Sequence, residues 1–124
     1  ELFSDLTKHH FVCMQSSNAE EVYSCLKDNI SVRFTRKDKE LPETEVKFAK
    51  DLLDEYQIKN RVKLTLTGLD IWFSNVNVNI AFKEELLKSP KDLEDAKHLR
   101  IVYAEQINEE EVKMVKQLIK RFRL

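Results

Sequence analysis

Glycine and proline are scarce in this sequence: its 124 residues include one glycine, Gly68, and two prolines. Loops that cradle phosphate groups, and the sharp turn that presents a nucleophilic serine, need glycines where the backbone approaches a ligand or turns tightly. A single glycine therefore comes close to excluding nucleotide binding of the P-loop or dinucleotide type and α/β-hydrolase chemistry.

Cysteine is equally scarce, with only Cys13 and Cys25. Two cysteines are too few for a disulfide framework and lack the spacing of metal ligands, which favours an intracellular compartment, the cytoplasm or the nucleus. No run of about 18 apolar residues is present, so we expect no membrane span. The formal net charge of −1 gives no general attraction to nucleic acid or anionic lipid, so an electrostatic partner needs a local charged patch.

The composition that remains is that of a globular protein with a highly charged surface, since 42% of the residues are hydrophobic and 35% are charged. A chain of 124 residues corresponds to one domain, which buries roughly two-thirds of its unfolded surface. We therefore predict a single α+β domain over residues 1–124. The chain begins at Glu1 rather than Met, which favours a domain excised from a larger protein or a processed product.

The stretch from Arg61 to Phe82 carries the strongest pattern, because apolar residues fall at every second position and the phase slips by one residue twice. Side chains of a strand alternate between faces, so tight turns at Thr67-Gly68 and Ser74-Asn75 would restore one continuous apolar face. The pattern predicts a three-stranded antiparallel meander with Val62 opposite Phe73. It is expected in an antiparallel or mixed sheet with helices packed mainly on one face.

Other elements are predicted from caps and periodicity. Residues 10–15 form an apolar strand expected at the centre of the sheet, and residues 30–35 alternate as a half-buried strand. Asn18 and Asn108 each precede a helix and have a glutamate three positions on, as in a capping box. Helices are also expected from Pro42 to about residue 56 and from Pro90 after a Ser89 cap, and a last strand is expected over residues 99–103.

The meander would present a polar second face around Trp72, the only tryptophan of the chain. A large aromatic ring among amides and charges is typical of an anchor for a partner protein or of a surface that stacks a nucleic-acid base. Base-stacking sheets usually carry two or three aromatic residues, so the partner hypothesis is favoured. Burial of Trp72 is the alternative, since tryptophans are highly buried on average. The predicted partner-binding residues are Trp72, Lys63, Asp70, Asn77 and Asn79.

Basic residues in one loop and on the last helix form a second candidate site. Such charges can contact phosphates, but acidic neighbours balance them, and ordinary solvated side chains are the alternative interpretation. The candidate nucleic-acid contacts are Arg33, Arg36, Lys37, Lys39, Lys120, Arg121 and Arg123.

Catalytic and metal-binding combinations are weak. His10 and Cys13 would point to opposite faces of a strand, which does not suit a shared metal ion. Cys25 and His98 could form a nucleophile and base pair only if the fold brings them together, and Cys25 lies on the inward stripe of its helix, where inert packing is favoured. No spaced carboxylate pair lies in an apolar setting. We therefore expect no catalytic residue, no metal and no cofactor.

These observations favour a non-catalytic interaction domain, an adaptor, scaffold or complex subunit that binds another protein through an exposed sheet face or edge. The alternative hypothesis is a nucleic-acid-binding module that uses the basic loop and the C-terminal helix. An enzyme ranks third, and neither a membrane nor a small molecule is expected as a partner.

Overall fold

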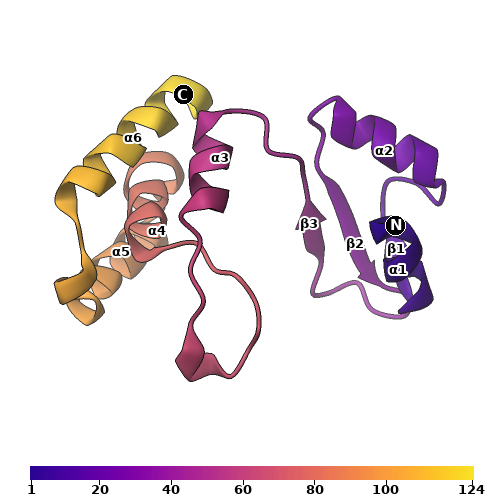
Figure 1. The fold of residues 1–124 in the computed structure, drawn as a ribbon, viewed down its shortest axis with the longest axis horizontal. Coiled ribbons are helices and arrows are strands. Elements are labelled where there is room, and N and C mark those ends of the chain that lie inside the picture. Colours follow the sequence, from indigo (N-terminus) through magenta and orange to yellow (C-terminus); the bar gives the residue numbers. More distant parts are fainter. The chain divides into compact units, whose positions relative to one another are not determined.

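The computed structural model describes residues 1–124 and divides them into two compact units, Glu1–Lys50 and Asp51–Leu124 (Figure 1). The chain contains six α-helices and a three-stranded antiparallel sheet, which confirms the α+β class. The grouping of both units in one domain stays a prediction. None of the helices has the length and apolar content that crossing a membrane requires.

The first unit contains the sheet, whose strand order is β1-β2-β3. Val32 of the central strand lies opposite Val46, and a small core forms where Val22 and Leu26 pack with Val32 and Phe34. The elements of this unit are α1 (Leu2–Lys8), β1 (Phe11–Cys13), α2 (Ala19–Lys27), β2 (Val32–Arg36) and β3 (Thr44–Val46).

Two predictions for this unit are corrected and two are confirmed, one of them the strand predicted over residues 30–35, which is present as β2. Strand β1 lies at an edge rather than at the centre, and Val12 is 43% exposed, so its apolar run is not covered on both faces. Pro42 does not begin a helix, because residues 44–46 pair with β2 instead. The Asn18 cap is confirmed, since its side chain accepts hydrogen bonds from the backbone N–H groups of Glu20 and Glu21 at 2.8 and 3.4 Å.

The second unit is helical. Its core joins Leu53 of α3 with Val78 and Ile80 of α4 and with Val115 and Ile119 of α6. Its elements are α3 (Leu52–Lys59), a 3-10 turn (Thr65–Thr67), α4 (Val76–Phe82), a π-helical turn (Lys83–Leu87), α5 (Pro90–Val102), a 3-10 turn (Ala104–Gln106) and α6 (Glu109–Arg123).

The meander predicted over residues 61–82 is wrong. Of its pairing only the bridge between Val62 and Phe73 is present, and residues 76–82 form helix α4. Asn75 does not close a hairpin; its side-chain oxygen accepts the N–H of Val78 at 2.9 Å and caps that helix. A period-two pattern can be incidental when a helix is buried around most of its circumference, because then no polar face is needed.

The helices near the C-terminus are close to the prediction, except that α5 is longer. Ser89 Oγ accepts the N–H of Asp92 at 3.1 Å, which confirms its cap, but the helix continues through Val102, so the strand at 99–103 is wrong. Leu99 packs against the core of the unit on a helical face. The cap of α6 is confirmed, since Asn108 Oδ1 accepts the N–H of Glu111 at 3.1 Å.

Candidate functional site

Residues 61–75, here called the arm, extend away from the end of α3 and return to the start of α4 (Figure 1). Two backbone N–H···O bonds of 2.8 Å between Val62 and Phe73 join the two sides of the arm at its base. The 3-10 turn Thr65–Thr67 forms the tip, and Gly68 follows it with a φ of 67°. Glycine adopts this left-handed conformation with little strain, which explains the position of the only glycine in the chain.

Large apolar side chains of the arm lie open to solvent. Leu66 at the tip is fully exposed, and Trp72 is 54% exposed. Leu64, Leu69 and Ile71 are exposed as well. Single exposed apolar residues are common on protein surfaces, whereas an accumulation of them marks a surface that binds another molecule.

Charged side chains surround the Trp72 ring. The guanidinium carbon of Arg61 lies 4.5 Å from the ring centroid and the ammonium of Lys63 lies 4.8 Å from it. Asp70 forms an ion pair with Lys63. Each cation over an exposed ring contributes about 0.5–1 kcal/mol, so these contacts orient the indole without burying it. Lys63, Asp70 and Trp72 are therefore neighbours as predicted, although the arm rather than a sheet carries them.

A groove of about 710 Å³ opens between the base of the arm, the start of α4 and the end of α5. Apolar and amide side chains line it, and Lys63 is the only charged residue among them. Its size and mixed lining are typical of sites that hold a side chain or a small ligand. The lining residues are Val62, Lys63, Leu64, Phe73, Ser74, Asn75, Val76, Asn77, Asn79, Leu99, Tyr103 and Gln106.

Glu111 of α6 fixes the base of the arm. Its carboxylate accepts hydrogen bonds from Tyr56 Oη at 2.7 Å, Asn75 Nδ2 at 3.1 Å and Asn77 Nδ2 at 2.7 Å. Asn75 Nδ2 also donates to the carbonyl oxygen of Asn60 at 3.2 Å. Burial and the neighbouring carboxylate raise the pKa of Tyr56 to about 12, so the phenol stays protonated and donates at neutral pH. The Glu111 side chain thus holds Tyr56, which precedes the arm, and Asn75, which ends it.

Asn77 and Asn79 lie on a helix rather than on a sheet face shared with Trp72, which corrects the prediction. Both belong to helix α4, and Asn77 is only 6% exposed. Its Oδ1 accepts the backbone N–H of Asn108 at 3.0 Å, while its Nδ2 binds Glu111. The prediction assumed that polar residues face solvent, but a buried amide is tolerated when its donors and acceptors are paired.

Two of the predicted nucleic-acid contacts in the first unit, Arg33 and Arg36, already interact with neighbouring side chains. Arg33 lies 3.5 Å from the carboxylate of Glu43, and Arg36 lies 5.9 Å from the ring centroid of Phe11. Lys37 and Lys39 are exposed. These cations belong to a different unit from those of α6.

The predicted contacts on α6 are less available. Arg123 forms ion pairs with Asp51 at 2.5 Å and Asp54 at 2.7 Å, and only 15% of its side chain is exposed. It therefore joins the end of α6 to the start of α3. Lys120 lies 3.8 Å from Glu85, and Arg121 remains exposed. The nucleic-acid hypothesis stays a prediction, and Arg123 is its least available member.

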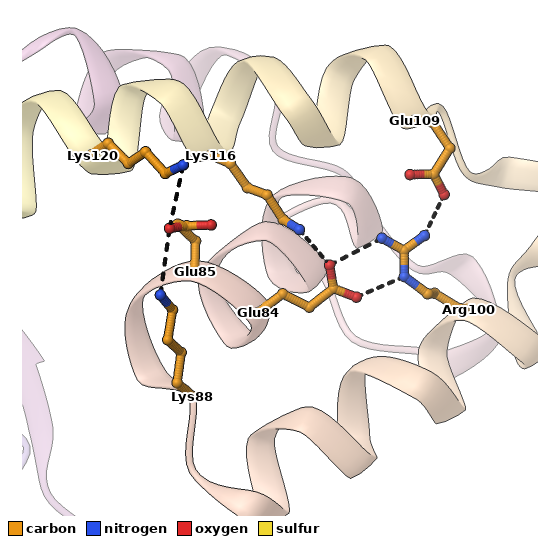
Figure 2. A network of polar contacts seen from close by, with 7 residues as sticks. All are labelled: Glu84, Glu85, Lys88, Arg100, Glu109, Lys116 and Lys120. Carbon is orange, nitrogen blue, oxygen red and sulfur yellow. Dashed lines mark hydrogen bonds and ion pairs between the residues drawn. The ribbon is translucent and has the colours of Figure 1, made fainter.

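A charged network joins α5, α6 and the π-helical turn, as Figure 2 shows. Glu84 accepts hydrogen bonds from Arg100 Nε at 2.7 Å and Lys116 Nζ at 2.7 Å. The hydrogen bond from Arg100 is the main cause that lowers the pKa of Glu84 to about 2. Arg100 also binds Glu109, and Glu85 pairs with Lys88 and Lys120. Because each carboxylate in the network faces a cation, it stabilises helix packing and offers no poised acid or base.

No group of three or more His, Cys, Asp or Glu side chains is arranged to hold a metal ion. Cys25 is a free thiol that packs against the core of the first unit. The arm and its groove are therefore the most developed candidate site in the structure.

Sequence reasoning missed the groove because it assigned Leu99 and Tyr103 to a strand. It also missed the exposure of Leu66, which it placed on the buried face of the meander. A signal was present in Thr67-Gly68, since a glycine between two apolar runs marks a reversal that need not belong to a continuous sheet.

No protein-family model, no curated protein and no solved structure matches this chain. Its function must therefore be inferred from its own residues and contacts.

Proposed function

We propose that this chain is a non-catalytic protein-protein interaction domain, an adaptor or a complex subunit, that binds its partner through the arm. The observation that carries the proposal is the exposure of Leu66, Leu69 and Trp72 on a segment that projects from the helices (Figure 1). Exposed tryptophan and leucine gain several kcal/mol in total when a partner covers them, at roughly 25 cal/mol per Å² of apolar surface.

The way the arm is built also supports binding. The bridge at Val62 and Phe73, the Gly68 reversal and the Glu111 hydrogen bonds hold the arm in one shape before any partner arrives. A preorganised segment loses less conformational entropy on association than a flexible one, which favours affinity. Glu111 and its partners therefore have a positioning role in this proposal.

The charge of the arm distinguishes a protein from a nucleic acid as the partner. Between residues 61 and 75 the cations Arg61 and Lys63 are accompanied by Asp70, so two positive charges and one negative charge leave little net positive charge on the arm. Phosphate-binding surfaces depend on accumulated positive charge and lose affinity steeply as salt rises. The arm carries more apolar residues than charged ones, as the centres of protein interfaces do.

Affinity capture from cell extract tests the proposal. The wild-type chain is compared with the double variant Leu66→Ser/Trp72→Ala and with Leu41→Ser, which removes an apolar side chain that is 73% exposed outside the arm. We expect a protein to be retained by the wild type and by Leu41→Ser at moderate salt and to be lost with the arm variant. Equal retention by all three chains, or retention of nucleic acid that disappears with salt, would refute the proposal.

A further inference from the structure

The inner side of the arm indicates which kind of partner segment fits. Leu64, Val76 and Leu99 contribute apolar walls to the groove, while Gln106 and Asn79 add amides. Lys63 is the single charged residue of the lining. Such a groove gains affinity from an apolar side chain that fills it and specificity from a charge that complements its one cation.

Lys63 is available for a partner. Its ion pair with Asp70 is open to water, since 43% of the lysine side chain and 89% of the aspartate side chain are exposed. An incoming carboxylate that replaces Asp70 at the ammonium leaves the aspartate in solvent, where it needs no counter-ion. The guanidinium of Arg61, on the same Trp72 ring, adds positive charge beside this position.

We infer that the groove binds a short segment of a partner protein in which an apolar side chain stands next to aspartate or glutamate. The apolar side chain lies between Leu64 and Leu99, and the carboxylate pairs with Lys63. This inference rests on the proposed function and specifies the chemistry of its partner. A basic segment is disfavoured, because it would bring like charge to Lys63 and Arg61.

Selection from a library of short random peptides displayed on phage tests the inference, with the 124-residue chain as bait. The variants are Lys63→Glu, which reverses the charge of the groove, and Gln106→Phe, which fills the groove from an exposed position. The matched control, Glu94→Phe, adds the same ring at an exposed position of α5 outside the lining. Circular dichroism verifies that each variant is folded.

The wild type and Glu94→Phe are expected to select peptides with a leucine, isoleucine, methionine or phenylalanine beside acidic residues. Lys63→Glu should select lysine or arginine at the acidic positions instead. Gln106→Phe should weaken the affinity of a selected peptide by about tenfold or more, as expected when an anchoring side chain is displaced.

Three results would overturn the inference: no enriched sequence on the wild type, enrichment without acidic residues, or a selection that Lys63→Glu leaves unchanged. The capture experiment above depends on the arm residues Leu66 and Trp72, which do not line the groove. Capture that depends on the arm, combined with any of these three results, refutes the groove and leaves the proposed function standing. If capture does not depend on the arm and one of these three results is also obtained, both the groove and the proposed function are refuted.

Discussion

The arm and helix α6 belong to the same unit and are both rich in large apolar residues, yet they expose them very differently. Val112, Val115 and Ile119 of α6 are at most 1% exposed, whereas Trp72 of the arm is 54% exposed and Leu66 is fully exposed. Helix α6 faces α3 and α4, and its apolar stripe becomes core. The apolar side chains of α6 therefore stabilise the fold, whereas those of the arm are left exposed to solvent.

Paired truncations should produce the largest difference between the two regions. Ile119→Ala creates a cavity in the core and should lower the free energy of unfolding by about 2–5 kcal/mol. Leu66→Ala removes a side chain that is exposed in the folded state and should change it by less than about 0.5 kcal/mol. Urea denaturation measures both. Comparable losses would mean that the tip of the arm is packed as tightly as α6.

Removal of the Glu111 carboxylate should give the next largest effect, because α6 and the base of the arm meet there. Glu111→Ala leaves Tyr56 and Asn77 Nδ2 without their acceptor and removes one of the two acceptors of Asn75, so it should lower the free energy of unfolding by about 2–3 kcal/mol. The neighbouring exposed residue provides the control, since Glu110→Ala should change stability by only about 0.5 kcal/mol. Equal effects of the two substitutions in thermal or urea denaturation would show that the hydrogen bonds at Glu111 do not hold the arm.

Acid should weaken the helical region through Glu84. Its pKa in the fold, about 2, lies below the ordinary value of 4.5, so the folded state favours the ionised carboxylate. The resulting stability is fully present above pH 4.5 and is lost as pH falls toward 2. Because the network is partly open to water, we expect a contribution of about 1–2 kcal/mol.

Unfolding measured at neutral pH and at about pH 3 should therefore show a smaller acid-induced loss in Glu84→Gln than in the wild type. Identical losses in the two proteins would show that the Arg100 and Lys116 contacts do not lower this pKa.

Substitution of the arm's glycine should have the smallest effect. A Cβ at Gly68 meets no heavy atom within 4 Å, so Gly68→Ala adds backbone strain from the φ of 67° and no clash. We expect a loss of about 1 kcal/mol, the lower end of the cost of a left-handed alanine, because no clash adds to it. A loss of several kcal/mol in urea denaturation would indicate that the arm reversal packs against other groups.

Local signals in the sequence were sufficient for several elements. The caps at Asn18, Ser89 and Asn108 lie at positions where the side chain reaches N–H groups two or three residues away, so neighbouring residues decide them. The opposition of Val62 and Phe73 was also predictable, because it depends on one reversal near Gly68.

Helix α4 and the location of the site could not be predicted in the same way. Asn77 is buried because Glu111 and Asn108, more than 30 residues away in the sequence, satisfy its amide. Without those partners its alternation with Val76 and Val78 resembles a half-exposed strand. Of the predicted site, Lys63, Asp70 and Trp72 are neighbours, close to the Val62–Phe73 bridge that remains of the meander, and their role in binding stays a prediction.

The fluorescence of Trp72 provides the most direct test of the claim that the arm lies outside the core. Trp72 is the only tryptophan, so its emission reports the arm alone. In the native protein we expect acrylamide and iodide to quench it nearly as strongly as in the unfolded chain, and caesium to quench it less because Arg61 and Lys63 repel cations. If none of the three quenchers reduces the emission until the chain unfolds, Trp72 is buried in the native protein, and the claim that the arm lies outside the core is contradicted.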